Sequence, residues 1–452
     1  MATSETNSIP SSLGVDPLPS LLREYATPAV IAMLASSLYN LVDSICIGQG
    51  LGPLALAAMG ITFPMTNICA AFGTLVGVGA SSLMAIRFGA KDYQSAKLIL
   101  GNLLMLNVFI GLLVMALALL FLDPILYFFG ASENTIDMAR EYMTIILIGN
   151  VITHLYFGLN AILRSSGHPQ LAMYATLVSV SLNVIMDVVF IFVFGWGIKG
   201  AAWATIIAQI VAFGWQLSVF FRKNEFLHIE RSIFKFDIQL VIDIFAIGMS
   251  PFLMNLASCA VVIIFNKQLM SYGGDLAIGS YSIIHRVTFM FCIFVMGLNQ
   301  GMQPIAGFNY GAKKYDRVTG IFKLTALWAT AITTFCGICC MLIPSLLVKI
   351  FTTDAATLDM CVPAMRIQSW SFPIVGFQMV AGNFFQSIGM AKKAIFLSLT
   401  RQVLYLIPLV LILPYFWRLN GIWLSMPISD VLSAITAVIM LVYQFRKFQA
   451  LN

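Results

Sequence analysis

Twelve long apolar runs follow one another along the chain, separated by short segments that carry most of the charged residues. Each run is continuous rather than alternating, and about 20 such residues cross the roughly 30 Å hydrocarbon layer of a bilayer as an α-helix. Backbone groups in lipid must be hydrogen-bonded within their own segment, which favours helices. We therefore predict an all-α integral membrane protein with twelve transmembrane helices, at residues 22–47, 54–83, 97–121, 138–163, 170–195, 199–221, 241–267, 277–307, 318–348, 359–388, 393–415 and 420–445.

The second half of the chain repeats the first at a distance of 222 residues. The sequence Gly-Ala-Lys-Asp-Tyr at 89–93 returns as Gly-Ala-Lys-Lys-Tyr at 311–315, and Gly167 corresponds to Gly389. Parallel repeats of about six spans are one way in which secondary transporters are built. The repeat predicts two pseudo-symmetric six-helix lobes, and it favours alternating access over a channel.

Composition and charge support this interpretation. Of the 452 residues, 60% are hydrophobic and 10% are charged, whereas soluble domains carry about 25% charged residues. With the N-terminus in the cytoplasm, 18 of the 25 Lys and Arg residues fall in inner loops and tails, Arg164 and Arg401 among them, and 4 fall in outer loops. This bias follows the positive-inside rule, so the net charge of +6 sets orientation rather than binding nucleic acid.

These charges also set the predicted domain boundaries. An even number of spans returns the C-terminus to the cytoplasm, and the longest inner loop is basic and joins the two repeats. We predict a cytoplasmic tail at 1–21, a first lobe at 22–221, a cytoplasmic linker at 222–240, a second lobe at 241–445 and a cytoplasmic tail at 446–452.

Two carboxylates lie inside predicted spans of the first lobe. Asp43 lies near the outer end of span 1, and Asp187 lies in the outer half of span 5. At 1.5 Å per residue, both lie about 10 Å below the outer surface, and Thr205 on span 6 falls at a similar depth. Asn183 and Tyr39 each precede one of these acids by four residues, which places them on the same helix faces.

Such a cluster suits a coupling ion. Burial disfavours the charged form of a carboxyl group, and a second carboxylate adds to the cost. The pair could take up H⁺ or Na⁺ on one side of the membrane and release it on the other. Carboxylate, amide and hydroxyl oxygens at Asp43, Asn183, Asp187 and Thr205 could form a Na⁺ shell. The alternative is two structural acids that face separate polar cavities.

The second lobe has no equivalent pair, since the repeat mates of the two acids are Phe265 and Leu409. Asp430 in span 12 is either a second cation site or, as we prefer, a structural acid paired with a nearby donor. Arg286 in span 8 is expected to be a buried structural charge rather than a substrate ligand. Pro28 in span 1 predicts a helix bend.

The chain resembles the multidrug and toxic compound extrusion (MATE) family, in its bacterial DinF-like and MepA-like branch. The resemblance covers residues 20 to 447 and is carried by three loops and two spans. The loops are Arg-Phe-Gly-Ala-Lys-Asp-Tyr at 87–93, Leu-Arg-Ser-Ser-Gly-His-Pro at 163–169 and Gly-Ala-Lys-Lys-Tyr at 311–315. The spans are those that contain Asp43 and Asp187.

This resemblance implies the MATE/MOP superfamily fold and export of amphipathic, often cationic drugs in exchange for H⁺ or Na⁺, with no cofactor. It implies cation coupling at Asp43, Asp187, Asn183 and Thr205, and a cavity lined by Tyr39 and Asn160, to which Asp430 and Arg286 are weaker additions. It links Pro28 to bending of span 1. We expect a monomer in the bacterial cytoplasmic membrane that binds small organic cations and no nucleic acid.

Other functions fit the sequence less well. A flippase for lipid-linked precursors or polysaccharides, from the same superfamily, needs a basic cavity for pyrophosphate, whereas the candidate residues here are acidic. A major facilitator would carry an Asp-Arg pair in the loop at 87–93. Paired His ligands, a nucleophile elbow and a phosphate loop are all missing from the sequence, which argues against an enzyme.

Overall fold

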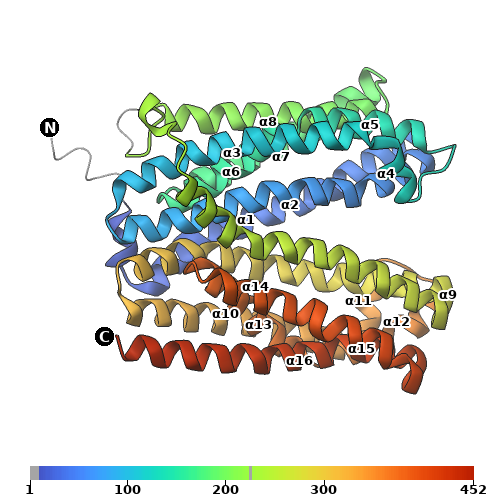
Figure 1. Ribbon diagram of the computed structural model, residues 1–452. Helices are drawn as coiled ribbons and strands as arrows, with labels where there is room; N and C mark the ends of the chain where they lie inside the picture. The colour runs from blue at the N-terminus through green and yellow to red at the C-terminus, as the bar shows by residue number, and fades with distance from the viewer. Residues whose placement is uncertain (1–9, 223–225, 452) are drawn as a thin grey trace. The chain divides into compact units, whose positions relative to one another are not determined.

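The computed structural model describes residues 10–222 and 226–451, and in that part of the chain every regular element is a helix (Figure 1). Residues 1–9 of the expected N-terminal tail, 223–225 of the expected linker and 452 of the expected C-terminal tail lie outside the described residues. The prediction of an all-α membrane protein is therefore confirmed for the described chain.

The first copy of the repeat is built from eight α-helices and two short turns of helix. A 3₁₀ turn at Ser11–Gly14 precedes α1, and a π-helical turn, η3, at Val189–Val193 continues α7. The α-helices are α1 (Leu18–Leu51), α2 (Pro53–Gly89), α3 (Tyr93–Leu120), α4 (Leu122–Phe128), α5 (Ile136–Ile148), α6 (Asn150–Ser165), α7 (Pro169–Val188) and α8 (Ile198–Phe220).

The second copy contains the same kinds of element. A 3₁₀ turn at Arg231–Ile233 precedes it, and a π-helical segment, η5, at Thr400–Leu406 joins α14 to α15. The α-helices are α9 (Ile238–Gly311), α10 (Tyr315–Leu342), α11 (Pro344–Lys349), α12 (Ala355–Ser369), α13 (Phe372–Ser387), α14 (Ala391–Leu399), α15 (Ile407–Ile412) and α16 (Pro414–Gln449).

The backbone confirms the duplication. Helices α3 and α10 begin and end 222 residues apart, and so do α6 and α13. Residues with positive φ recur at the same spacing, which means that the turns as well as the helices are repeated; the pairs are Gly52 (86°) with Gly274 (64°), Lys91 (60°) with Lys313 (58°), and Gly167 (95°) with Gly389 (74°). Gly274 interrupts α9, so this long helix contains two predicted spans.

Nine helices in the described residues are long and apolar enough to cross a membrane, and α5 with α6, bent by 52°, would make a tenth. The break in α9 divides one of these helices into two. Helices α12 and α13 occupy the predicted span at 359–388, although length and apolarity alone do not select them. The arrangement is consistent with the twelve predicted spans.

The described chain forms two compact units. Unit 1 contains the chain up to Val15 together with Ile31–Phe252, and unit 2 contains Asp16–Val30 together with Leu253–Asn452. The chain changes unit beside Pro28 in α1 and beside Pro251 in α9. Helix α1 continues through Pro28 without a break. The predicted division of the chain into lobes at 22–221 and 241–445 stays a prediction.

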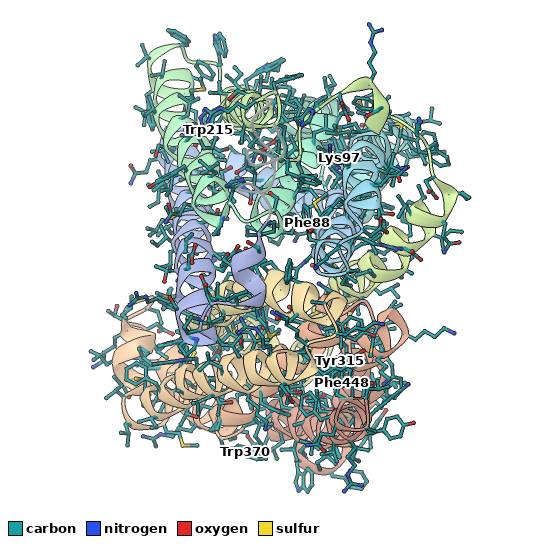
Figure 2. All side chains as sticks on the ribbon, turned by 90° about the vertical axis from the view of Figure 1, so that its left-hand side faces the viewer. Phe88, Lys97, Trp215, Tyr315, Trp370 and Phe448 are labelled. Carbon is teal, nitrogen blue, oxygen red and sulfur yellow. The ribbon has the colours of Figure 1, made fainter. Side chains whose placement is uncertain are left out.

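Each unit has its own apolar core. In unit 1 the core includes Ile47, Leu126 and Leu147, and in unit 2 it includes Phe265 and Trp423. Aromatic contacts add to the packing at one end of unit 2, where the rings of Tyr315 and Phe448 stack with centroids 4.8 Å apart (Figure 2). Tyr315 belongs to the repeated loop sequence, so this loop is held by a helix of its own unit.

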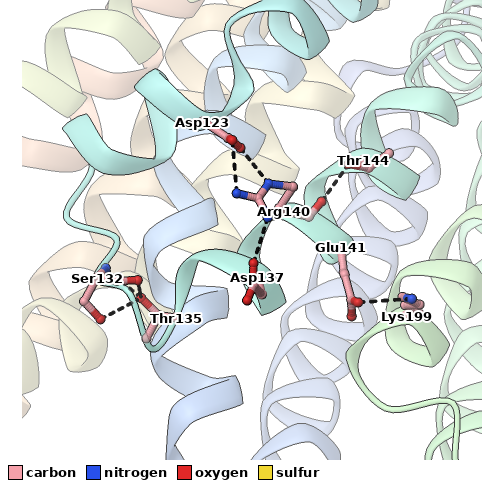
Figure 3. Close-up of polar contacts among 8 residues, drawn as sticks. All are labelled: Asp123, Ser132, Thr135, Asp137, Arg140, Glu141, Thr144 and Lys199. Atoms are coloured by element: carbon pink, nitrogen blue, oxygen red, sulfur yellow. Dashed lines mark hydrogen bonds and ion pairs between the residues drawn. The ribbon is translucent and has the colours of Figure 1, made fainter.

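A group of ion pairs ties together the short helices at one end of unit 1 (Figure 3). Arg140 Nε lies 2.7 Å from Asp123 Oδ1, and Arg140 Nη1 lies 2.7 Å from Asp137 Oδ1. Lys199 Nζ lies 3.1 Å from Glu141 Oε1. The hydrogen bonds from Arg140 hold the pKa of the Asp123 carboxyl below its usual range. Such exposed pairs contribute about 0–1 kcal/mol each, so they position loops more than they stabilise the fold.

Two glycines allow α2 and the first part of α9 to cross closely within unit 1. A Cβ added at Gly248 would lie 1.7 Å from the Leu75 carbonyl oxygen, and one added at Gly79 would lie 2.1 Å from the Ile244 carbonyl oxygen. Both obstacles are backbone atoms, which cannot rotate away as a side chain can. The crossing therefore depends on glycine at these positions.

We expect Gly248→Ala to destabilise the protein by about 1–3 kcal/mol, the usual cost of overpacking a close contact. Gly214→Ala in α8 is the matched control, because nothing lies within 4 Å of its added Cβ. Replacing a helical glycine there removes about 0.5–1 kcal/mol of conformational cost. Thermal unfolding in detergent measures both variants, and equal stability of the two would contradict the close crossing.

Candidate functional site

The two acids singled out from the sequence lie together inside unit 1. Asp43 comes from α1 and Asp187 from the last turn of α7, and their carboxyl groups interact electrostatically. The exposed fractions are 2% for Asp43 and 0% for Asp187. Two carboxyl groups that interact in a buried place make it costly for both to be ionised at once.

A shell of neutral oxygens extends from Asp187 to α8 and α1. With its amide oriented to satisfy both neighbours, Asn183 donates from Nδ2 to Asp187 Oδ2 at 3.0 Å and accepts from the Thr205 backbone N–H at 3.0 Å. The Thr205 hydroxyl lies 3.2 Å from the same amide oxygen. Tyr39 Oη is 3.3 Å from Thr205 Oγ1. The structure thus brings together all five residues that helix spacing had suggested.

Each acid keeps one carboxyl oxygen without a partner. Among the described residues, neither Asp43 Oδ1 nor Asp187 Oδ1 accepts a hydrogen bond, although both atoms are buried. Buried acceptors are normally satisfied, so an unpartnered oxygen on each of two interacting acids indicates a place for a proton or a hard cation. The described chain contains no group of three or more His, Cys, Asp or Glu that could hold a metal ion. Two acids with neutral oxygens suit a monovalent ion better.

Sequence reasoning did not find Tyr142 of α5. Its buried ring interacts electrostatically with Tyr39, Asp43 and Asp187, which places its hydroxyl beside the site. One Tyr among 14 in the chain gives no sequence signal by itself. Its position depends on how α5 packs against α2 and α8. A π-helical turn, η3, begins two residues after Asp187, and such turns are frequent at functional sites.

Asn160 does not contact the acid pair. It lies on α6, where Nδ2 donates to the Ala172 carbonyl at 2.9 Å and to Thr176 Oγ1 at 3.3 Å. Its amide oxygen accepts from Arg164 Nη1. Asn160 therefore belongs to a second polar group within unit 1, made with α7. Arg164, which we had counted only as an inner-loop charge, is part of that group.

Asp430 of α16 forms a buried ion pair inside unit 2. Arg401 Nε lies 2.8 Å from Asp430 Oδ1, with side chains 25% and 6% exposed, and Ser371 Oγ donates to Asp430 Oδ2 at 3.0 Å. The preferred reading of Asp430 as a structural acid paired with a donor agrees with this contact. The assignment of Arg401 to an inner loop was wrong, because Arg401 lies in η5, within the predicted span 393–415.

The side chain of Arg286 is exposed, whereas the sequence predicted that it would be buried. We expected a buried charge paired with carbonyls or an acid, but Arg286 is exposed on α9 and has no hydrogen bond or ion pair within the described part of unit 2. Its helical neighbour His285 is exposed as well. A guanidinium on a four-bond stem reaches polar surroundings more easily than a shorter side chain, which lets it stay unpaired.

The comparisons with known proteins agree on one family. The family model MatE matches residues 28–189 and 246–412, and these two matches fall on the two copies of the repeat. The multidrug export protein MepA of Staphylococcus aureus (strain MRSA252) is 27% identical over 425 residues, which cover 94% of this chain and 93% of MepA.

Solved structures show the same fold. One is described as the outward-facing conformation of a multidrug resistance MATE family transporter of the MOP superfamily; it is 25% identical, covers 99% of both chains and has a TM-score of 0.92. Another is a MOP superfamily transporter from Pyrococcus furiosus, described as having a binding pocket of reverse polarity, with 24% identity, coverage of 97% and 98%, and a TM-score of 0.91.

Proposed function

The chain belongs to the MatE family of multi-pass membrane transporters, which are not enzymes, and we propose that it exports amphipathic, often cationic compounds in exchange for H⁺ or Na⁺. The name of the relative MepA, a multidrug export protein, supports the substrate class. The compounds are small organic molecules and need no cofactor for export. The setting we propose is the bacterial cytoplasmic membrane, with a monomer whose two termini are cytoplasmic.

The observation that carries the coupling proposal is the buried pair Asp43–Asp187. The two carboxyl groups interact inside the protein, and each keeps one unpartnered oxygen. Negative charge on them is costly in a low-dielectric interior, and bound H⁺ or Na⁺ would offset it. Asn183 and Thr205 could complete the oxygen shell of Na⁺ or hydrogen-bond the protonated acids, with Tyr39 fixing the Thr205 hydroxyl.

Drug export and cation entry are coupled because both ligands shift the same conformational equilibrium. A ligand that binds two conformations equally well shifts neither, so drug and cation must each favour a different conformation. In the proposed cycle, the cation enters the pair from outside, favours release of the drug and accompanies the return to the inward-open state. Pro28 and Pro251 lie where the chain passes from one compact unit to the other, and we propose that α1 bends at Pro28 during this cycle.

Transport in proteoliposomes tests this proposal. Liposomes loaded with a fluorescent organic cation are given a pH gradient or a Na⁺ gradient separately. We expect efflux that follows one gradient and stops when an ionophore for that ion collapses it. Efflux that follows neither gradient, with correctly inserted protein, would overturn coupled drug export. That outcome would favour the flippase for lipid-linked precursors.

A further inference from the structure

One face of helix α7 carries a buried stripe of polar residues. Ser179, Asn183 and Asp187 are buried, whereas Ile185 and Val188 are 60% and 44% exposed. The buried residues follow one another at intervals of four along a single helix face. In a membrane protein, outward apolar residues suit lipid, and an ionisable residue in a buried polar stripe, such as Asp187 here, is a candidate for an ion path.

Helix α6 extends this stripe toward the start of α7. The Tyr156 hydroxyl donates to Thr176 Oγ1 at 3.5 Å. Thr176 Oγ1 accepts from Asn160 Nδ2 at 3.3 Å. One helical turn, about 6 Å, separates Ser179 from Asn183. Polar side chains therefore extend along α6 and α7 from the acid pair to Asn160, at Asn183, Ser179, Tyr156 and Thr176.

Arg164 closes the far end of this stripe. Its guanidinium donates to the amide oxygen of Asn160, and it is half-buried in the last turn of α6. No carboxylate pairs with Arg164 within the described residues, so its positive charge is not neutralised. A fixed arginine of this kind repels protons and metal cations that approach along a polar path.

The second copy of the repeat provides an internal comparison. The repeat mate of Arg164 is Gln386 on α13, which is neutral, and the mate of Asp187 is Leu409. The unpaired arginine thus occurs in the copy that has the acid pair and is missing at the same position of the copy that has none.

We propose that Arg164, held by Asn160, is an electrostatic plug that prevents coupling cations from passing from the acid pair through unit 1. The ion gradient can drive drug export only if the cation does not cross the protein without drug. The polar stripe that hydrates the acids would otherwise conduct cations across unit 1. Arg164 acts on the cation through Asn160 and the stripe, so it is a positioning residue for coupling.

Passive ion flux tests this proposal, which rests on the proposed coupling site. Protein in liposomes without any drug is exposed to a pH gradient, with K⁺ and valinomycin holding the membrane potential at zero, and a trapped dye reports the internal pH. We expect Arg164→Gln to raise proton flux by about tenfold, the order produced by a unit charge at about 10 Å and an effective dielectric constant of about 20. The same experiment with ²²Na⁺ covers a Na⁺-coupled protein.

Three further variants make the result specific. Arg164→Lys keeps the charge and should keep flux low, and Arg222→Gln, which removes an exposed arginine beyond the end of α8, should also leave flux low. The double variant Arg164→Gln with Asp187→Asn should return to low flux, because the path then lacks an acid. Asn160→Ala, which releases the guanidinium, should leak as well and replaces Arg164→Gln if that variant does not fold.

Unchanged flux of both cations in folded Arg164→Gln and Asn160→Ala would overturn the plug. A leak that persists in the double variant would also overturn it, since the ions would then bypass Asp187. The assay contains no drug, so its outcome is independent of drug export. A leak without any drug export by the wild type would refute the proposed substrates and leave the plug intact.

Discussion

Replacing Asp187 by asparagine is expected to reduce gradient-driven drug efflux to the background of empty liposomes. Asparagine has nearly the shape of aspartate and can still accept the hydrogen bond from Asn183, so the fold should persist. Its amide neither takes up a proton nor adds negative charge to a cation site. We expect the same loss for Asp43→Asn, because the two buried carboxyl groups interact electrostatically and act as a pair.

The measurement is efflux of the fluorescent cation under the gradient that drives the wild type, together with drug binding at equilibrium. Binding should be kept while efflux is lost, since the drug and the cation are linked rather than held by the same atoms. Asp137→Asn is the matched control, because the Asp137 side chain is 80% exposed and pairs with Arg140 at the end of unit 1 (Figure 3). Normal efflux in either variant of the acid pair would remove that acid from coupling.

Residue spacing along a helix predicted part of this site, because it gives the depth of a residue and the helix face on which it lies. Asp43 and Asp187 were expected at one depth because their spans run in the same direction, and i, i+4 spacing placed Asn183 beside Asp187. Counting residues along a helix does not say which helices are neighbours. For that reason Tyr142, which reaches the acids only through the packing of α5, was missed.

The charged residues show the same limit. Arg401 lies within a predicted span, yet a basic residue near one end of a span is equally well explained by the positive-inside rule. Its partner Asp430 is 29 residues away on another helix, a separation that carries no sequence signal. Arg286 was expected to be buried because charge in a membrane usually is, but its long side chain stays on the exposed face of α9.

The fold was easier to predict than the site, because the helices and turns of one copy have counterparts in the other copy. Apolar runs gave most helices, and the 222-residue repeat gave the matching turns at Gly52 and Gly274. The bend between α5 and α6 and the π-helical turns η3 and η5 were not foreseen. Such local departures from a regular helix depend on neighbouring side chains and not on the hydrophobic pattern.

The second large effect is expected from Asp430→Ala, which should destabilise the protein by about 3–5 kcal/mol, the usual cost of leaving one buried charge without its partner. Arg401 would then lose its carboxylate while staying fixed in η5, where its own carbonyl accepts from Ser429 Oγ at 2.7 Å. The polar network that joins α16, η5 and the junction of α12 and α13 through Ser371 would lose its centre. Thermal unfolding in detergent measures the loss.

The double variant Arg401→Met with Asp430→Leu separates a structural pair from a transport site. Replacing both charges by apolar side chains of similar volume is often neutral or stabilising by about 1–4 kcal/mol, so we expect stability to recover. Drug efflux should recover with it, because coupling is proposed at the acids of unit 1 alone. Asp137→Asn again serves as the control, since breaking an exposed pair costs about 0–1 kcal/mol. If the double variant has the stability of the wild type but no longer exports drug, Asp430 acts in transport. Both copies of the repeat would then contribute an acid to transport.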